Sequence, residues 1–298
     1  MVTPERSGQS GVKGLAAIIP CSGRILRSGW VGRLNEMELS AIVKALDTYV
    51  KPQTSPLGLK MFAGDEELPA KVKLAGKDLG KRVAICQAFS MARKYGWTVA
   101  VSKEDQSCPI GSVVLGFQPA VDFYTEGNLC DGMYTINKAA GANSEAKVLR
   151  FPEGKFRYLV VGPLERIDFR PDLVLVYGSP AQVMRLVQGA LYIEGGNITS
   201  TFSGRAECSE TVVQTLNSGK CQVVLPGNGE RVFGQTQDHE LAFTMPWSEV
   251  EKTLEGLAAT HKGGVRYPIP AWLNYQVTFP PKYQKLEELW SVTGLDKK

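Results

Sequence analysis

The sequence is poor in histidine and lacks the short motifs that identify many enzymes. Among its 298 residues, only His239 and His261 are histidines, and neither lies in a metal-binding spacing. We find no Walker motif, no G-x-G-x-x-G dinucleotide fingerprint and no G-x-S-x-G nucleophile turn. A histidine-based metal centre is therefore not expected. Motifs alone leave open whether the protein is an enzyme.

Long apolar runs are also absent. No stretch reaches the roughly 18 apolar residues that a membrane-spanning helix needs. Residues 14–20 (GLAAIIP) are the one candidate for a signal-peptide core, but about seven residues is the short limit for such a segment. We therefore expect a cytoplasmic protein with no membrane partner.

Strong charge of one sign is missing as well. The formal net charge is +4. Residues 1–36 carry five basic and two acidic side chains, so they contribute +3 of this net charge. The remaining residues are close to neutral, so a broad nucleic-acid-binding surface is not expected. Residues 1–36 are rich in Gly, Ser and Arg and show no helical or strand period, whereas a regular pattern begins at Met37. We predict that residues 1–36 are either a disordered arm or an over-extended start, followed by a single α/β domain over residues 37–298.

Apolar periodicity predicts an α/β or α+β fold, with helices interleaved with the strands of a mixed sheet. The clearest signal is the apolar strand 172–177, followed by Gly178 and a helix that begins at Ser179-Pro180. Ser179 and Gln182 form a capping box at this helix start. Ser248 and Glu251 predict a second capping box. Other helices are expected at 83–95 and 207–216, and other strands at 57–62, 97–101, 156–161, 222–225 and 241–245.

Two segments share a layout. In the first, Cys86 begins a helix that ends at Gly96, a strand follows, and Cys108 lies in the next loop. In the second, Cys208 begins a helix that ends at Gly219, and a strand leads to a turn containing Gly227 and Gly229. The Cys-to-Gly spacing is 10 residues in the first segment and 11 in the second. Either an internal duplication or two ordinary helix–strand units explains this pattern.

With these segments in view, the chain resembles the uncharacterised family known as domain of unknown function 169, which occurs mainly in archaea and anaerobic bacteria. The resemblance covers roughly Met37 to Pro270. It rests on LGLKMF (57–62), the Cys86 helix with Cys108-Pro109, DLVLVYGSPAQVMRLVQ (172–188), the Cys208 helix with GNGER (227–231), and RYPIP (266–270). Relatives tend to begin near Met37, and many carry a cysteine where this chain has Gly227. The resemblance implies the fold but no established activity.

The cysteines are the first candidate site. Cys86 and Cys208 are expected near helix N-termini, where the helix dipole lowers a thiol pKa. Together with Cys108, they form a candidate ligand set for an iron–sulfur cluster or another thiolate-bound metal. Their sequence spacing matches no compact ligand motif, so buried structural thiols are the alternative interpretation.

The second candidate is the strand–turn–helix at Gly178, Ser179 and Gln182. Free N–H groups at a helix start favour an anion, and a simple helix cap is the alternative. Arg231, in a segment expected to be a plain turn, is a candidate partner for a carboxylate or phosphate.

The sequence thus supports three hypotheses: a metal or iron–sulfur protein of anaerobic metabolism, a metal-free module that binds a small anionic metabolite, and a structural subunit whose cysteines belong to the core. The oligomeric state does not follow from the sequence.

Overall fold

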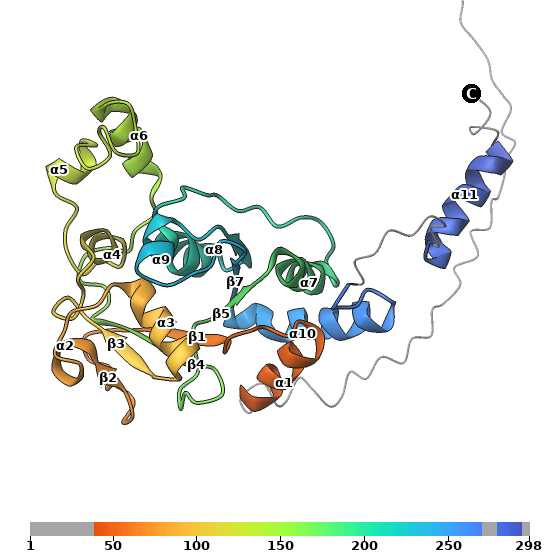
Figure 1. Cartoon of the computed structure of the whole chain (residues 1–298), viewed down its shortest axis with the longest axis horizontal. Helices are drawn as coiled ribbons and strands as arrows, with labels where there is room; N and C mark the ends of the chain where they lie inside the picture. The colour runs from red at the N-terminus through yellow and green to blue at the C-terminus, as the bar shows by residue number, and fades with distance from the viewer. Residues whose placement is uncertain (1–38, 270–278, 294–298) are drawn as a thin grey trace, which may run out of the picture. The chain divides into compact units, whose positions relative to one another are not determined.

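A computed structural model describes residues 39–269 and 279–293 (Figure 1). Within them, a seven-stranded sheet has the order β2-β3-β4-β1-β5-β7-β6. Only β2 and β3 are parallel, and the other pairs are antiparallel. The strands are β1 (Leu57–Phe62), β2 (Lys73–Leu74), β3 (Val99–Val101), β4 (Tyr158–Pro163), β5 (Leu173–Gly178), β6 (Gln222–Val224) and β7 (Leu241–Pro246). The predicted α/β class with a mixed sheet is confirmed.

Helices are interleaved with these strands along the chain. They are α1 (Leu39–Tyr49), α2 (Ala75–Asp78), α3 (Ile85–Tyr95), α4 (Pro109–Val114), α5 (Asp122–Thr125), α6 (Lys138–Lys147), α7 (Pro180–Leu191), the π-helical turn η1 (Ser209–Val213), α8 (Gln214–Ser218), α9 (Asn228–Val232), α10 (Trp247–Lys262) and α11 (Pro281–Thr293). In the described part of the chain, none of them is both long and apolar enough to cross a membrane.

Helices cover both faces of the sheet. Alternate residues of β1 and β5, such as Leu59 and Leu175, share one apolar core with Phe89 of α3 and Val212 of η1. Side chains alternate between the two faces of a strand, so Val174 points to the opposite face. There α7 and α10 pack against β5 and β7 (Figure 1). The face that carries α3 and η1 is the one on which the cysteine-bearing segments lie.

The two halves of the sheet repeat the same register. β1 pairs with β4 over six residues, from Leu57 opposite Pro163, and β5 pairs with β7 over six residues, from Leu173 opposite Pro246. β3 and β6 then join β4 and β7 at corresponding positions. Between the halves, β1 meets β5 in a register that is symmetric about the pair Gly58 and Val174. The strands are thus related by an approximate two-fold axis, which agrees with an internal duplication. The duplication itself stays a prediction.

The π-helical turn accounts for the unequal spacing of the two segments. Gly96 and Gly219 both end their helices in the left-handed conformation and both lie three residues before the next strand. A π-turn holds one residue more than an α-turn. Because η1 follows Cys208, that cysteine is 11 residues from its glycine, while Cys86 is 10 residues from Gly96.

Three details of the local predictions are wrong. The segment 227–231, expected as a plain turn, contains helix α9. No helix or strand is expected within residues 63–80, yet β2 and α2 form there. The Ser248–Glu251 capping box is absent because α10 begins at Trp247, two residues before the start that a Ser248 cap would give, with Pro246 at the N-cap directly after β7. The predictions for residues 1–36 and for Met37 as the start lie outside the described residues.

Candidate functional site

The three cysteines proposed as ligands come from three separate helix starts. Cys86 is the second residue of α3, and Cys108 and Cys208 are the N-cap residues of α4 and η1. α3 packs against α9, and α4 packs against η1. The Cys86 thiol lies 3.7 Å from the carbonyl oxygen of Gly229 in α9. Strand pairing in the sheet therefore brings together segments that are more than 100 residues apart in sequence.

Two buried glutamates lie among these thiols. Glu207 precedes Cys208, and Glu230 is the third residue of α9; their exposed fractions are only 1% and 5%. The two carboxyl groups are near enough to interact, and after burial the charge of Glu230 is the main cause that raises the pKa of Glu207. Tyr177, at the end of β5, donates a hydrogen bond of 3.0 Å to Glu207 Oε1, whereas Glu207 Oε2 is buried without a protein partner. Burial and the neighbouring Glu230 carboxyl therefore disfavour ionisation of Glu207.

The thiols and carboxyls influence one another electrostatically. Burial and then the charge of Glu230 raise the pKa of Cys86 and of Cys208, and Cys108 adds to both effects. Burial also raises the pKa of Glu207 and Glu230, because desolvation disfavours the charged form. The expectation that helix N-termini lower the thiol pKa is thus wrong for Cys86 and Cys208. Burial and neighbouring acidic groups outweigh the helix dipole.

We call this group of residues the thiol–carboxyl cluster: Cys86, Cys108, Cys208, Glu207 and Glu230. Among the described residues, no three His, Cys, Asp or Glu side chains are already arranged around one point as metal ligands. The cluster therefore brings potential ligands into one buried region without placing them in coordination geometry. Five cysteines, Cys86, Cys108, Cys130, Cys208 and Cys221, are free thiols.

A buried ion pair borders the cluster. Arg93 of α3 lies over the ring of Tyr177, and its Nη1 is 2.6 Å from Oε1 of Glu240. Arg93 is thereby neutralised by Glu240, a residue outside the cluster. Because Glu240 neutralises it, the positive charge of Arg93 is less available to Glu207 and Glu230.

The turn at Gly178, Ser179 and Gln182 forms the predicted capping box, and both of its hydrogen bonds are present. Ser179 N–H donates to Gln182 Oε1, and Gln182 N–H donates to Ser179 Oγ. Gln182 Nε2 donates to the carbonyl oxygens of Val50 and Lys51, which follow α1. The polar groups of this turn thus join α7 to the end of α1. Its binding of an anion stays a prediction.

Arg231 lies on α9, on the same short helix as Glu230. Its Nη1 donates a 2.6 Å hydrogen bond to the carbonyl oxygen of Gln237, and Asp238 Oδ1 lies 3.8 Å from the same nitrogen. Its guanidinium is therefore already engaged with the following loop. The structure does not bring Arg231 and Ser179 into a common hydrogen-bond network among the described contacts.

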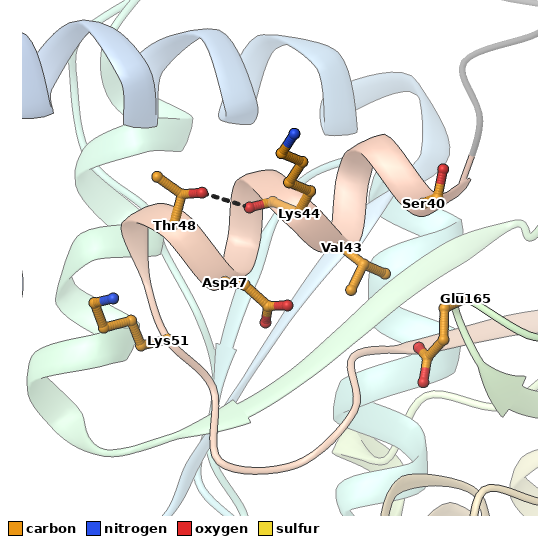
Figure 2. Close-up of a pocket in the computed structure, with 7 residues that line it drawn as sticks. All are labelled: Ser40, Val43, Lys44, Asp47, Thr48, Lys51 and Glu165. Atoms are coloured by element: carbon orange, nitrogen blue, oxygen red, sulfur yellow. Dashed lines mark hydrogen bonds between the residues drawn. The ribbon is translucent and has the colours of Figure 1, made fainter.

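Two surface hollows in the described part of the chain lie outside the cluster. One of about 490 Å³ runs along α1 and is lined by Ser40, Val43, Lys44, Asp47, Thr48, Lys51 and Glu165. Figure 2 shows that Lys44 points away from Asp47 and Glu165, so these charged groups do not converge on one point. A second hollow, of about 370 Å³, lies beside the end of α7 and includes Cys221. Neither contains a residue of the thiol–carboxyl cluster.

Sequence reasoning missed Glu207 and Glu230. These two carboxylates are 23 residues apart and match no motif, so no local pattern marks them as a pair. One signal was present: Glu207 directly precedes a candidate ligand, and Glu230 lies in the GNGER segment that carries the resemblance. Their burial was not visible in the sequence.

Fold and site together define a mixed-sheet α/β protein in which two strand sets of equal register flank a buried thiol–carboxyl cluster. The family model of domain of unknown function 169, described as uncharacterised ArCR, matches residues 45–256. The chain belongs to this family. An uncharacterized protein of the archaeon Methanocaldococcus jannaschii is 23% identical over 203 residues, which cover 67% of this chain and 85% of that protein. No solved structure matches the chain.

Proposed function

We propose that this protein binds a metal or iron–sulfur centre through Cys86, Cys108 and Cys208, as a cytoplasmic protein of anaerobic metabolism. The observation that carries the proposal is the thiol–carboxyl cluster itself. Three thiols from separate helix starts and two buried carboxyl groups lie in one region, and none of these five groups is positively charged in any protonation state. A bound cation supplies the missing positive charge.

The chemistry of the donors supports a soft or borderline metal. Thiolates bind zinc and the iron of iron–sulfur clusters, and a metal-bound thiol is deprotonated. Without a cation, burial and Glu230 keep the pKa of Cys86 raised. Metal binding reverses this balance, because the positive charge stabilises the thiolates and releases their protons.

The buried oxygen Glu207 Oε2 is a second support. Buried polar atoms are nearly always hydrogen-bonded, so a carboxyl oxygen without a partner needs an explanation. A cation or a bound water in the cluster provides one. Since no three ligands already surround one point, the proposal includes side-chain rotation of the cysteines when the centre is loaded.

The test is metal analysis with a visible absorption spectrum on the full chain, purified without oxygen. We expect iron or zinc in the wild-type protein and its loss in C86S, C108S and C208S. The matched control is C221S, which alters a buried thiol outside the cluster. If the wild-type protein is folded but holds no metal, and takes up none on reconstitution with iron and sulfide or with zinc, the proposal is wrong.

A further inference from the structure

Helices α5 and α6 carry a buried polar group of side chains that is separate from the thiol–carboxyl cluster. The two helices pack against each other beyond α4 (Figure 1). Gly127, two residues after α5, has a positive φ, and a Cβ atom added there lies 2.1 Å from the backbone nitrogen of Ala142 in α6. Glycine allows this close approach. The position of α5 is thereby fixed against α6.

Glu145 of α6 is at the centre of this group. Its side chain is 1% exposed and forms an ion pair of 2.8 Å with Nη2 of Arg205, whose side chain is 4% exposed. The Cys130 thiol donates a hydrogen bond of 3.1 Å to Glu145 Oε1. Burial alone raises the pKa of Glu145, but its polar neighbours, with Arg205 first among them, lower it below its ordinary value. Glu145 is therefore ionised at neutral pH and neutralises Arg205.

Arg150 lies beside this ion pair without a charged partner of its own. Its guanidinium carbon is 5.5 Å from the ring centroid of Tyr124 in α5. Its Nη1 is buried without a hydrogen-bond partner, and within the described part of the chain the guanidinium forms no ion pair. The ring face attracts the cation but offers no lone pair to this N–H group. Buried donors are nearly always paired, so this nitrogen calls for an acceptor.

The charges around the Tyr124 hydroxyl do not balance. Burial raises the pKa of this hydroxyl most, Glu145 raises it further, and Arg205 and Arg150 lower it. Two guanidiniums and one carboxylate thus lie around one phenol group. Nε of Arg205 is also buried without a hydrogen-bond partner. Since Glu145 neutralises Arg205, the positive charge of Arg150 is in excess.

The backbone holds Arg150 in place from both sides. The carbonyl oxygen of Leu149 accepts a 2.7 Å hydrogen bond from Ser209 Oγ of η1. The N–H of Phe151 donates a 2.9 Å hydrogen bond to the carbonyl oxygen of Val114 in α4. Arg150 as a whole is half-buried, which leaves it accessible from solvent. An arginine that is held in this way loses little conformational freedom when it binds a ligand.

We infer that Arg150, beside the Glu145–Arg205 ion pair, binds the carboxylate group of a small monoanionic ligand. The planar guanidinium matches a carboxylate with two parallel N–H···O hydrogen bonds. One negative charge balances the excess of one positive charge, whereas a dianion would bring an unmatched charge into a partly buried region. None of these residues belongs to the thiol–carboxyl cluster, so the inference does not depend on the proposed metal centre.

The experiment is a calorimetric titration of the full chain with sodium acetate, with sodium chloride keeping the ionic strength constant. Wild-type protein is expected to show saturable binding of one acetate per chain. R150Q removes a charge-assisted hydrogen bond and is expected to weaken acetate binding at least roughly 10-fold. R150K keeps the charge without the planar fork and should lie between the two. The matched control is R157Q, because Arg157 also lies over a tyrosine ring, that of Tyr158, but is exposed. It should bind acetate as wild type does.

Circular dichroism checks that the variants are folded, and R150K carries the comparison if R150Q is not. If the wild-type protein shows no saturable binding of acetate, water alone meets the buried nitrogen of Arg150 and the inference is wrong. Equal affinity of wild type and R150Q would place the acetate elsewhere and also overturn it. A parallel titration with inorganic phosphate tests the charge of the ligand. Phosphate that binds more tightly than acetate, and depends on Arg150, would overturn the monocarboxylate assignment.

Discussion

The guanidinium of Arg93 lies over the ring of Tyr177, with 4.0 Å between its central carbon and the ring centroid. The same group forms a buried ion pair with Glu240, across 147 positions of sequence. Arg93 thus joins α3 of one strand set to β5 and to the loop before β7 of the other. Tyr177 in turn holds Glu207 of the thiol–carboxyl cluster. Stability and site geometry are coupled through this arginine.

Replacing Arg93 with leucine is expected to destabilise the fold by about 3–5 kcal/mol, because it leaves the Glu240 carboxylate buried without its partner. Chemical denaturation of the purified variant measures this change. The double variant R93L/E240L should recover most of the loss, since neither charge remains. K252A, which removes two solvent-exposed ion pairs, is the control and should cost less than about 1 kcal/mol. An equal loss in R93L and K252A would contradict the prediction.

The Arg93–Glu240 pair also predicts a pH dependence. Burial alone raises the pKa of Glu240, but hydrogen bonds from Arg93 and from the Gln237 N–H, together with the charge of Arg93, lower it below its ordinary value. The unfolded chain therefore takes up this proton first as the pH falls. The pair stabilises the fold above the ordinary carboxyl pKa, and that contribution disappears as the pH drops through the lowered value.

The measurement is the free energy of unfolding of wild type and E240Q between neutral pH and about pH 3. The difference between the two proteins should shrink as the pH falls, and other titrating groups largely cancel in this comparison. A difference that stays constant over the whole range would show that Glu240 does not carry a lowered pKa.

Burial of the thiols predicts slow alkylation in the folded, metal-free protein. Burial raises the pKa of Cys130 to about 11 and that of Cys221 to about 12, and it raises the pKa of Cys86 as well. Only the thiolate reacts, so each unit by which the pKa rises lowers the reactive fraction about tenfold. With iodoacetamide at pH 8, these three cysteines should react more slowly than the half-buried Cys108.

Peptide mass spectrometry over a time course gives the extent of labelling at each cysteine. In urea the differences should vanish, because all thiols are then exposed. Rapid labelling of Cys86 in the folded protein, at its rate in urea, would mean that this thiol is not buried.

The strand–turn–helix at 172–191 shows what the sequence predicts well. An apolar run, a glycine, and a Ser-Pro start with Gln182 three residues after the cap all favour the same local structure, and the capping box forms as predicted. The second predicted box failed because β7 runs directly into α10. Tertiary pairing moved the helix start to Trp247, ahead of Ser248.

The site was only partly predictable. Cys86 and Cys208 were placed at helix starts from the local pattern, and both positions are confirmed. Their pKa direction was wrong because it depends on burial and on Glu230, which reach them only through the pairing of distant strands. Local rules give the direction of a helix dipole, but not the desolvation that outweighs it here.

The crossing of α7 and α10 depends on two glycines. A Cβ added at Gly256 meets the carbonyl oxygen of Gly189, and one added at Gly189 lies 2.7 Å from Leu257 Cγ. G256A should therefore push the helices apart and cost about 1–3 kcal/mol, despite the better helix propensity of alanine. Thermal and chemical denaturation measure it against E255A, an exposed neighbour that should change stability by less than about 0.5 kcal/mol. A stabilised G256A would contradict the close crossing.

Gln182 provides the sharpest test of the turn after β5. Its side chain accepts from the Ser179 N–H and donates to the carbonyl oxygens of Val50 and Lys51. Q182A leaves these buried or half-buried backbone groups without a partner and is expected to cost about 1–3 kcal/mol. S179A removes the hydroxyl cap alone and should cost about 1 kcal/mol.

Adding inorganic phosphate tests whether this turn has only a structural role or also binds an anion. If the turn only joins α7 to the end of α1, phosphate should raise the melting temperature of wild type, S179A and Q182A by the same small amount. Specific binding at Ser179 predicts a larger rise in wild type than in S179A, because at the same concentration a ligand that binds more tightly stabilises the folded state more. We expect the first result, since Ser179 and Gln182 already bond to each other and to the end of α1. A phosphate effect that S179A abolishes would establish the turn as a binding site.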